Sequence, residues 1–316
     1  MATTPTTTNY TADKSEESTS LLNRLMNLSW GTVLAWIFVI LLVILTFFPF
    51  YWALRTALST QRMLFTNSSE LGPVGYTTVN FLRVLGMVST EEAVAAGGSG
   101  QALDFWLYLR NSFIVSSVVT AGQIFFSAMA AYAFARLRFP GRDKIFLLFI
   151  AALMVPAMVL LIPNFILVRD LGWLNTYKGI VAPYFLMTPF AIFFLRQFFL
   201  NINRELEDAA QIDGANYFTI FWRIILPISQ PPIVTLAIIT FITHWNDYLW
   251  PLLVGRKEEV RVLTVALGVF KSQTPQGAPD WTGLMAGTLL SVIPILLIFL
   301  FLGRRVVDSI QFTGVK

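Results

Sequence analysis

Cysteine is absent from the 316 residues of the chain, and histidine occurs only once. The chain can therefore form neither a disulfide framework nor a thiolate metal or redox site. One histidine cannot build a histidine-rich cluster either, so we expect no bound metal. Charged residues are also scarce, at 13% with a net charge of +4, and the basic ones are spread over loops. Nucleic-acid binding consequently has no electrostatic basis.

A phosphate-binding loop of the form GxxxxGK[ST] is missing as well, so we expect neither ATP hydrolysis nor a catalytic residue in this chain. Apolar residues dominate instead, at 56% with a mean hydropathy of +0.66. A helix of about 20 apolar residues crosses a hydrocarbon core of about 30 Å. Six runs are long enough, which predicts an all-α membrane protein. Its six transmembrane helices are expected at residues 31–54, 107–135, 145–168, 179–200, 231–254 and 283–303.

Prolines fall inside several of the later runs. They are Pro156, Pro163, Pro183, Pro189 and Pro294. An interrupted helix survives in a bilayer only where the freed backbone groups are buried in protein or face a wet cavity. The prolines therefore indicate either a translocation path or simple kinks in the helices.

The distribution of basic residues predicts the orientation of the spans. Four of them crowd the loop between the second and third spans: Arg136, Arg138, Arg142 and Lys144. By the positive-inside rule this loop is cytoplasmic, and six spans then place the N and C termini in the cytoplasm too. Residues 1–30 are rich in Thr and Ser and predict a disordered N-terminal tail, while 306–316 form a C-terminal tail. The basic cluster at 256–261 falls on the opposite side, against the rule.

This orientation divides the rest of the chain into loops and a core. Residues 55–106 form an outer loop, in which the glycines at 97, 98 and 100 predict a flexible insert. Residues 107–305 form a five-helix core, and its long inner loop runs from 201 to 230.

The inner loop contains a compact helix with its own start and stop signals. Asn203 can cap its N-terminus, and Glu205 and Glu207 lie in the first turn, where acids complement the helix dipole. Gly214 stands where a residue in the left-handed conformation would end the helix. A second helix is expected from Tyr217 onward, and Pro227 should stop it.

The same loop carries a specific spacing. Asp208-Ala209-Ala210 is followed after three residues by Gly214, after nine more by Ile224, and after one more by Leu226-Pro227. This pattern resembles the EAA loop of permease subunits in bacterial ATP-binding-cassette importers. Asp208 replaces the usual glutamate, and Asn203 stands where relatives often have proline. The resemblance implies a type I importer permease fold in the bacterial inner membrane.

Further segments resemble the carbohydrate-uptake branch of these importers, particularly the maltose-type smaller permease subunit. They are Asn111-Ser112, Ala131-Tyr-Ala-Phe-Ala-Arg136, Leu174-Asn-Thr-Tyr177, Trp245-Asn-Asp-Tyr-Leu-Trp-Pro251, Leu284-Met-Ala-Gly287 and Thr313-Gly-Val-Lys316. The resemblance implies that the chain moves a sugar or oligosaccharide by alternating access. Its partners would be a homologous second permease, two ATPase subunits that hold ATP and Mg, an extracytoplasmic solute-binding protein and the lipid membrane.

The residue types in the inner loop suit coupling to an ATPase. Adjacent alanines let a partner backbone approach closely, carboxylates accept its hydrogen bonds, and glycine permits the turn that makes the helix protrude. The candidate coupling residues are Glu207, Asp208, Ala209, Ala210, Asp213 and Gly214. The alternative is an amphipathic turn on the surface without a partner.

Polar residues inside the spans mark a candidate substrate path, because they are costly to bury in lipid. Aromatic rings suit the faces of sugars, and carboxylates and amides suit their hydroxyls. The candidates are Asn246, Asp247, Tyr248, Trp245, His244, Asn164 and Gln123. The alternative is an aromatic belt at the membrane interface, with Asp247 bound to a backbone donor or a loop arginine.

The sequence is also compatible with other functions. An importer of glycerol phosphate would need basic groups along its cavity. An ion-coupled secondary transporter would show intramembrane charge pairs or duplicated broken segments. A membrane scaffold would need no transport path at all.

Overall fold

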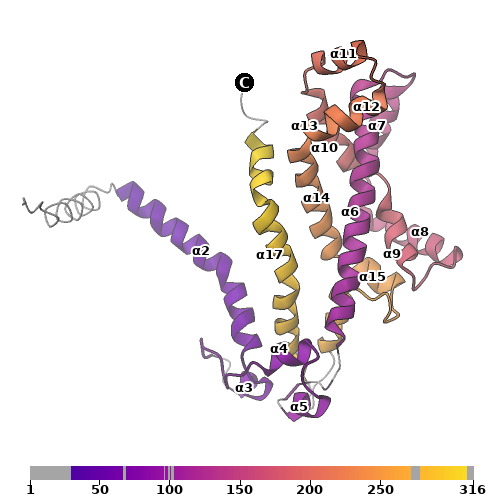
Figure 1. The fold of residues 1–316 in the computed structure, drawn as a ribbon. Coiled ribbons are helices and arrows are strands. Elements are labelled where there is room, and N and C mark those ends of the chain that lie inside the picture. Colours follow the sequence, from indigo (N-terminus) through magenta and orange to yellow (C-terminus); the bar gives the residue numbers. More distant parts are fainter. Residues whose placement is uncertain are drawn as a thin grey trace, which may run out of the picture. The chain divides into compact units, whose positions relative to one another are not determined.

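The structure is a computed structural model, and it describes residues 30–66, 69–95, 97–98, 100, 103–271 and 278–311. Every regular element in these ranges is a helix (Figure 1). The helices are α2 (Trp30–Ala57), α3 (Gln61–Thr66), α4 (Val79–Val84), α5 (Thr90–Ala95), α6 (Phe105–Arg136), α7 (Arg142–Ala152), α8 (Ala157–Asp170), α9 (Tyr177–Phe185), α10 (Pro189–Leu200), α11 (Glu205–Ile212), α12 (Tyr217–Ile220), η1 (Phe221–Ile225), α13 (Leu226–Ile228), α14 (Gln230–Trp245), α15 (Leu249–Val254), α16 (Leu263–Ala266), η2 (Leu267–Lys271) and α17 (Trp281–Gln311). The chain divides into two units, Met1–Leu54 and Arg55–Lys316, which are described separately.

The first unit contains most of α2, a helix that is apolar on all sides. Most of its large hydrophobic side chains from Trp30 to Leu54 are exposed. A helix with this composition is stable where lipid surrounds it. The tail expected at 1–30 lies outside the described residues as far as residue 29, and Trp30 already belongs to α2. At the other terminus α17 continues to Gln311, so the beginning of the segment expected as a tail is helical.

Within the described residues, three helices are long and apolar enough to cross a membrane, namely α2, α6 and α17 as far as Gly303. Three further spans are bent helix pairs: α7 with α8 at 97°, α9 with α10 at 42°, and the segment Tyr217–Ile228 with α14 at 79°. Counting each pair as one span gives up to six, in agreement with the sequence. The spans expected at 145–168 and 179–200 are both broken in the middle, near two of the prolines that the sequence places inside them.

The breaks follow from backbone chemistry at two prolines. Pro156 is the N-cap of α8, and Pro189 is the first residue of α10. A residue that precedes proline is kept out of the helical region by the proline ring, so the preceding helix cannot continue into it; α7 ends at Ala152 and α9 at Phe185. The Thr188 hydroxyl then accepts the backbone N–H of Ala191 at 3.3 Å and starts α10. Pro163, Pro183 and Pro294, by contrast, lie inside continuous helices.

The span expected at 231–254 also ends early, because α14 stops at Trp245 and α15 starts at Leu249. Pro251 has no N–H, so in a continuous helix the carbonyl of Asp247 would lose its partner. The hydroxyl of Thr264 donates to that carbonyl instead, at 2.7 Å. The break therefore has its backbone group satisfied by a neighbouring segment.

The second unit packs around α6, which contacts α9, α10 and α14. Small side chains on α6 at Ala128, Ala131 and Ala135 face a cluster on α10 that includes Leu195 and Phe199. Small residues allow two helices to approach closely. In lipid the hydrophobic effect does not drive helices together, so this close packing is what favours their association. α6 is therefore the central helix of this unit.

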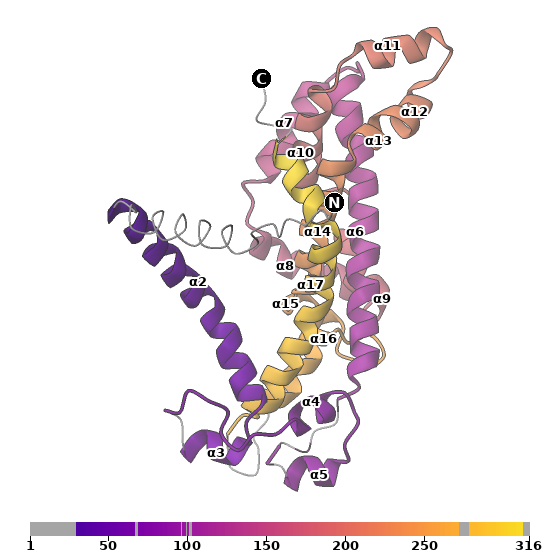
Figure 2. The same cartoon turned by 60° about the vertical axis from the view of Figure 1, so that its left-hand side comes forward.

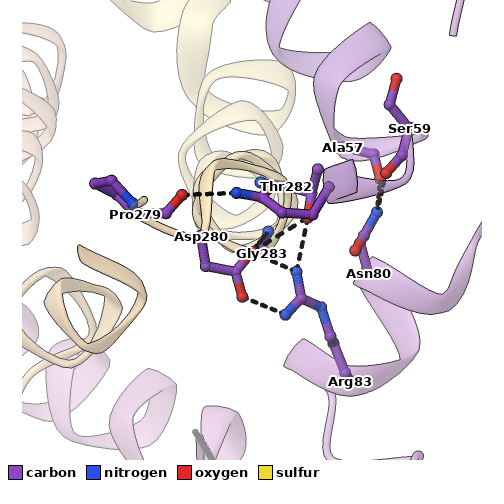
Figure 3. Close-up of polar contacts among 9 residues, drawn as sticks. Ala57, Ser59, Asn80, Arg83, Pro279, Asp280, Thr282 and Gly283 are labelled. Atoms are coloured by element: carbon purple, nitrogen blue, oxygen red, sulfur yellow. Dashed lines mark hydrogen bonds and ion pairs between the residues drawn. The ribbon is translucent and has the colours of Figure 1, made fainter. Parts of the chain in front are cut away.

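The segment 55–106, expected as a loop, forms α3, α4 and α5 around a buried polar cluster (Figure 3). The Arg83 guanidinium on α4 makes two contacts with the carboxylate of Asp280, one of them 2.6 Å long, and donates to the Thr282 hydroxyl at 2.8 Å. The Gln61 side-chain amide donates to the Pro279 carbonyl at 2.7 Å. These bonds tie α3 and α4 to the start of α17.

The glycines of this segment are packed, in contrast to the flexible insert expected from the sequence. Gly97 and Gly98 are buried, and the backbone N–H of Gly98 donates to the carbonyl of Ala93 at 2.9 Å. A Cβ on Gly98 would lie 2.1 Å from Nη1 of Arg83, so glycine is needed for the close approach. Residue 99 lies outside the described residues.

The second unit has different helices at its two ends. α11 and α12 stand at one end, and α3, α4 and α5 gather at the opposite end, in both views (Figures 1 and 2). α6 extends over the distance between these ends with 32 residues, about 48 Å at the α-helical rise.

Candidate functional site

The short helix α11 is defined at both ends by local hydrogen bonds. The Asn203 side chain accepts the backbone N–H of Glu205 at 3.1 Å, although the N-cap position itself is Arg204, one residue later than expected. At the other end, the N–H of Gly214 donates to the Gln211 carbonyl at 3.0 Å, and the N–H of Ala215 donates to the Ala210 carbonyl at 2.9 Å. This pair of bonds is the Schellman motif. Gly214 has a φ of +84°, as the sequence predicts.

The outward side of α11 and the turn after it hold most of the candidate coupling residues. Asp208, Ala209, Asp213 and Gly214 are exposed, whereas Ala210 is half-buried. Ile212, also on this side, is 88% exposed. The structure thus brings four of the six candidates to the exposed side of α11 and the turn after it, whereas Ala210 packs against the core. Their role in coupling stays a prediction.

Glu207, the sixth candidate, points inward. Its carboxylate lies 2.8 Å from Nε of Arg136, the last residue of α6, and both side chains are almost fully buried. Burial raises the pKa of the Glu207 carboxyl, and the nearby Arg136 guanidinium opposes that rise. This carboxylate is therefore engaged within the chain, whereas the carboxylates of Asp208 and Asp213 remain exposed.

An open hollow of about 430 Å³ lies beside this ion pair. Its lining includes Arg138, Arg204, Asp208, Gln211 and Tyr217. Charged and polar groups from the end of α6 and from α11 thus face the same space, which is large enough for side chains of a partner protein.

The helix that follows α11 is longer than the sequence indicates. Asn216 caps α12 by accepting the backbone N–H of Thr219 at 2.8 Å. The chain then passes through the π-helical turn η1, where the N–H of Leu226 donates to the Phe221 carbonyl. Pro227 does not stop the run as expected, because a π turn before it shifts the bonding pattern by one residue; the helix ends at Ile228.

The candidate substrate-path residues separate into two groups. Trp245 is buried away from the break and donates from Nε1 to the Ser291 carbonyl on α17 at 3.2 Å. Asn164 lies on α8, half-buried. Neither side chain lies with the other candidates, although Trp245 is the last residue of α14.

The remaining candidates lie near the break after α14. The His244 ring is 5.1 Å from the ring of Tyr184, and the Gln123 side-chain amide donates to the Tyr184 carbonyl at 3.4 Å. Asn246 and Tyr248 are exposed at the break.

Asp247 is bonded to a backbone donor, as expected if this segment is an aromatic belt at the membrane interface. Its carboxylate accepts the N–H of Trp250 at 3.4 Å, which caps the start of α15. The long bond leaves capacity for further donors on a carboxylate with several lone pairs. A path-lining role for Asp247 therefore stays a prediction.

Sequence reasoning missed several residues that organise these sites. The sequence assigns no role in either site to Arg136 or Tyr184, yet Arg136 pairs with Glu207 of α11 and the Tyr184 ring contacts His244. Asn111 and Asn175 hold the loop at 256–261. Asn111 donates to the carbonyls of Glu259 and Arg261, both at 3.0 Å, and Asn175 accepts the N–H of Arg256 at 2.9 Å. No local signal shows such long-range bonds.

Several long helices expose apolar side chains over most of their surface, and the capped helix α11 stands at one end of them. This arrangement is that of a multi-pass membrane protein. The chain belongs to the family described as binding-protein-dependent transport system inner membrane component, whose model matches residues 123–311. It is thus a transport subunit of the inner membrane, not an enzyme, and the sequence-based resemblance is confirmed.

Individual relatives agree with this family. The chain is 36% identical over 212 residues to the arabinooligosaccharides transport system permease protein AraQ of Halalkalibacterium halodurans, covering 67% of this chain and 75% of that protein. It is 33% identical over 269 residues to the sn-glycerol-3-phosphate transport system permease protein UgpE of Yersinia pestis, covering 85% and 92%.

A solved structure confirms the fold. A chain from a bacterial ABC transporter involved in the import of the acidic polysaccharide alginate superposes with a TM-score of 0.70. The match covers 95% of this chain and 99% of that chain, at 22% sequence identity. At this identity the likeness shows the fold alone, which is the type I importer permease fold expected from the sequence.

Proposed function

We propose that the chain is the membrane-spanning permease subunit of an ATP-driven importer that moves a sugar or oligosaccharide across the bacterial inner membrane by alternating access. The observation that carries the proposal is α11, a capped helix with exposed carboxylates at Asp208 and Asp213 and an exposed Ile212. Exposed carboxylates can accept hydrogen bonds from a partner protein, and an exposed apolar side chain can be buried against it. We infer that separate ATPase subunits, which hold ATP and Mg, bind here.

The proposed orientation places α11 in the cytoplasm, with both termini on the same side. The supporting observation is that Glu207 of α11 contacts Arg136, directly before the basic loop that holds Arg138, Arg142 and Lys144. Basic loops of this kind lie on the cytoplasmic side. The end with α3, α4 and α5 then faces outward, toward a solute-binding protein. A homologous second permease completes the path through the membrane.

The sugar assignment is supported by the oligosaccharide named for AraQ and by the residues around the break after α14. Tyr184 and His244 offer ring faces, and Asn246 offers an exposed amide, whereas the amide of Gln123 is buried. A glycerol phosphate substrate is the second candidate. It is supported by UgpE and by Lys271, whose ammonium lies 5.3 Å from the Tyr248 ring, because a phosphate requires a cationic partner.

The test is purification of the assembled complex with its native binding protein, followed by mass spectrometry of the bound solute. ATP hydrolysis is then measured with binding protein loaded with an oligosaccharide or with sn-glycerol-3-phosphate. Stimulation by the oligosaccharide supports the sugar assignment, and stimulation by the phosphate ester alone replaces it. Uptake that survives loss of the ATPases but collapses with an uncoupler would assign the chain to ion-coupled transport.

A first prediction concerns the substrate path. Asp247→Ala is expected to raise the apparent KM for uptake roughly tenfold, because a hydrogen bond to a charged group contributes about 1.5–3 kcal/mol. Assembly with the partner subunits should be unchanged. Asp247→Asn is the matched control, since its amide oxygen can still accept the Trp250 N–H. Normal uptake kinetics in Asp247→Ala would remove this residue from the path.

A further inference from the structure

The coupling helix α11 has an unusual attachment to the rest of the protein. Among its eight residues, all of them described, Glu207 is the one that is buried. An ordinary surface helix packs through an apolar stripe several residues long. α11 instead has Ala210, which packs against the apolar cluster of α6 and α10, and one ionised side chain, Glu207, whose carboxylate lies 2.8 Å from Nε of Arg136. The side chains of Arg136 and Glu207 are only 3% and 7% exposed.

Arg136 contacts a second part of the same loop. Its Nη2 donates to the carbonyl of Ile202, in the turn that leads from α10 into α11. One guanidinium thus binds both the chain entering the helix and the first turn of the helix. Arginine can do this because its planar group presents several donors in a fixed geometry.

The chain leaving the coupling helix is held by the same face of α6. Tyr132 lies one turn before Arg136, and its ring packs on the ring of Phe221 in η1, with 5.3 Å between centroids. Residues four apart share a helix face. The last two turns of α6 therefore hold the segments on both sides of α11.

A buried ion pair contributes little to stability compared with an apolar pair of the same size, because desolvation of both charges offsets their attraction. An uncompensated charge in that position is costly, however, so the two side chains are held together. The pair is therefore better suited to holding α11 in a fixed position than to stabilising the fold.

We propose that Arg136 and Glu207 form the mechanical link through which a displacement of α11 reaches α6. This inference rests on the proposed function and makes Arg136 a positioning residue for coupling. When an ATPase moves α11, the link carries the movement into α6, which continues to the opposite end of the unit. Without the link, α11 moves with the ATPase while α6 stays in place.

The first test is Arg136→Met in the complete complex. ATPase subunits should still bind, because the outward side of α11 is unchanged. Stimulation of ATP hydrolysis by loaded binding protein should fall at least about fivefold, the lower end of usual coupling factors, and ATP consumed per solute should rise. Arg142→Met is the matched control, because Arg142 pairs with an exposed partner, Asp143, and should leave both values unchanged.

The second test separates coupling from assembly. Because the chain has no cysteine, Arg136→Cys with Glu207→Cys introduces two unique thiols. A short bis-methanethiosulfonate bridges them through disulfides that a reductant cleaves. In one assembled complex with cysteine-free partners, coupling should be low before bridging, recover with the bridge and be lost again on reduction. Each single-cysteine variant, treated in the same way, should not recover.

The outcomes distinguish this inference from the proposed function. Full coupling in Arg136→Met, or no change on bridging, would overturn the link. Failure of Arg136→Met and of the double-cysteine complex to assemble would make the pair a folding determinant and also overturn it. A wild-type chain that never binds ATPases would refute the proposed function itself, and the link with it.

Discussion

Asp280→Ala is expected to lower the free energy of unfolding by about 3–5 kcal/mol, the usual cost of removing one partner from a buried ion pair. Asp280 is fully buried, and Arg83 is only 8% exposed. The variant also loses a helix cap, because the Asp280 carboxylate accepts the backbone N–H of Gly283 at 2.9 Å. The measurement is thermal denaturation of the purified protein in detergent, where the melting temperature should drop markedly.

Asp104→Ala provides the matched control. The Asp104 carboxylate caps α6 by accepting the N–H of Leu107 at 3.1 Å; it is exposed and forms no ion pair with the residues that the structure describes. Loss of this cap should lower the free energy of unfolding by only about 1 kcal/mol. The double variant Arg83→Met with Asp280→Asn should regain much of the loss, because no unpaired charge remains buried. Equal destabilisation by Asp280→Ala and Asp104→Ala would show that the ion pair contributes nothing beyond the cap.

Gly214→Val is expected to uncouple ATP hydrolysis from uptake. Gly214 has a φ of +84°, where a side chain costs about 1–2 kcal/mol and a β-branched one is a clear outlier. A Cβ there meets no atom within 4 Å, so the effect comes from the backbone and not from a clash. When the turn opens, Asp213 and Ile212 leave their positions on the protruding surface. The measurement is stimulation of ATP hydrolysis by loaded binding protein, together with uptake.

Two variants isolate this effect. Gly214→Asn should retain coupling, because asparagine tolerates the left-handed conformation. Gly172→Val carries the same strain elsewhere, since Gly172 has a φ of +69° and also has no atom within 4 Å of a Cβ. It should lose similar stability without losing coupling. Coupling that is normal in Gly214→Val, or equally impaired in Gly172→Val, would refute a special role for the turn.

Proline shows why the spans could be predicted from the sequence but their shapes could not. Apolar runs locate the spans because crossing lipid requires a minimum length of apolar chain. Whether a proline breaks a helix depends on what satisfies the freed carbonyl. Near Pro251 the Thr264 hydroxyl does so and the helix is broken, whereas Pro163 and Pro294 remain within continuous helices. The partner groups come from segments that sequence periodicity does not connect.

The candidate site likewise has features that the sequence predicts and features that it does not. The boundaries of α11 were predictable to within one residue, because they depend on the side chain of Asn203 and the conformation of Gly214. The inward direction of Glu207 was not predictable. It is one of three acids in the first turn, and only the position of Arg136 at the end of a distant helix decides which of them is buried.

The amino-acid sequence by itself determined that this protein lies in the membrane, where its spans begin, and where the protruding helix starts and stops. These properties depend on local composition and on backbone conformation within a few residues. Tertiary structure alone decided which spans bend, that α3, α4 and α5 form an ordered group on Arg83 and Asp280, and that Arg136 holds the coupling helix. A buried charge or a freed carbonyl must find its partner wherever the fold places one.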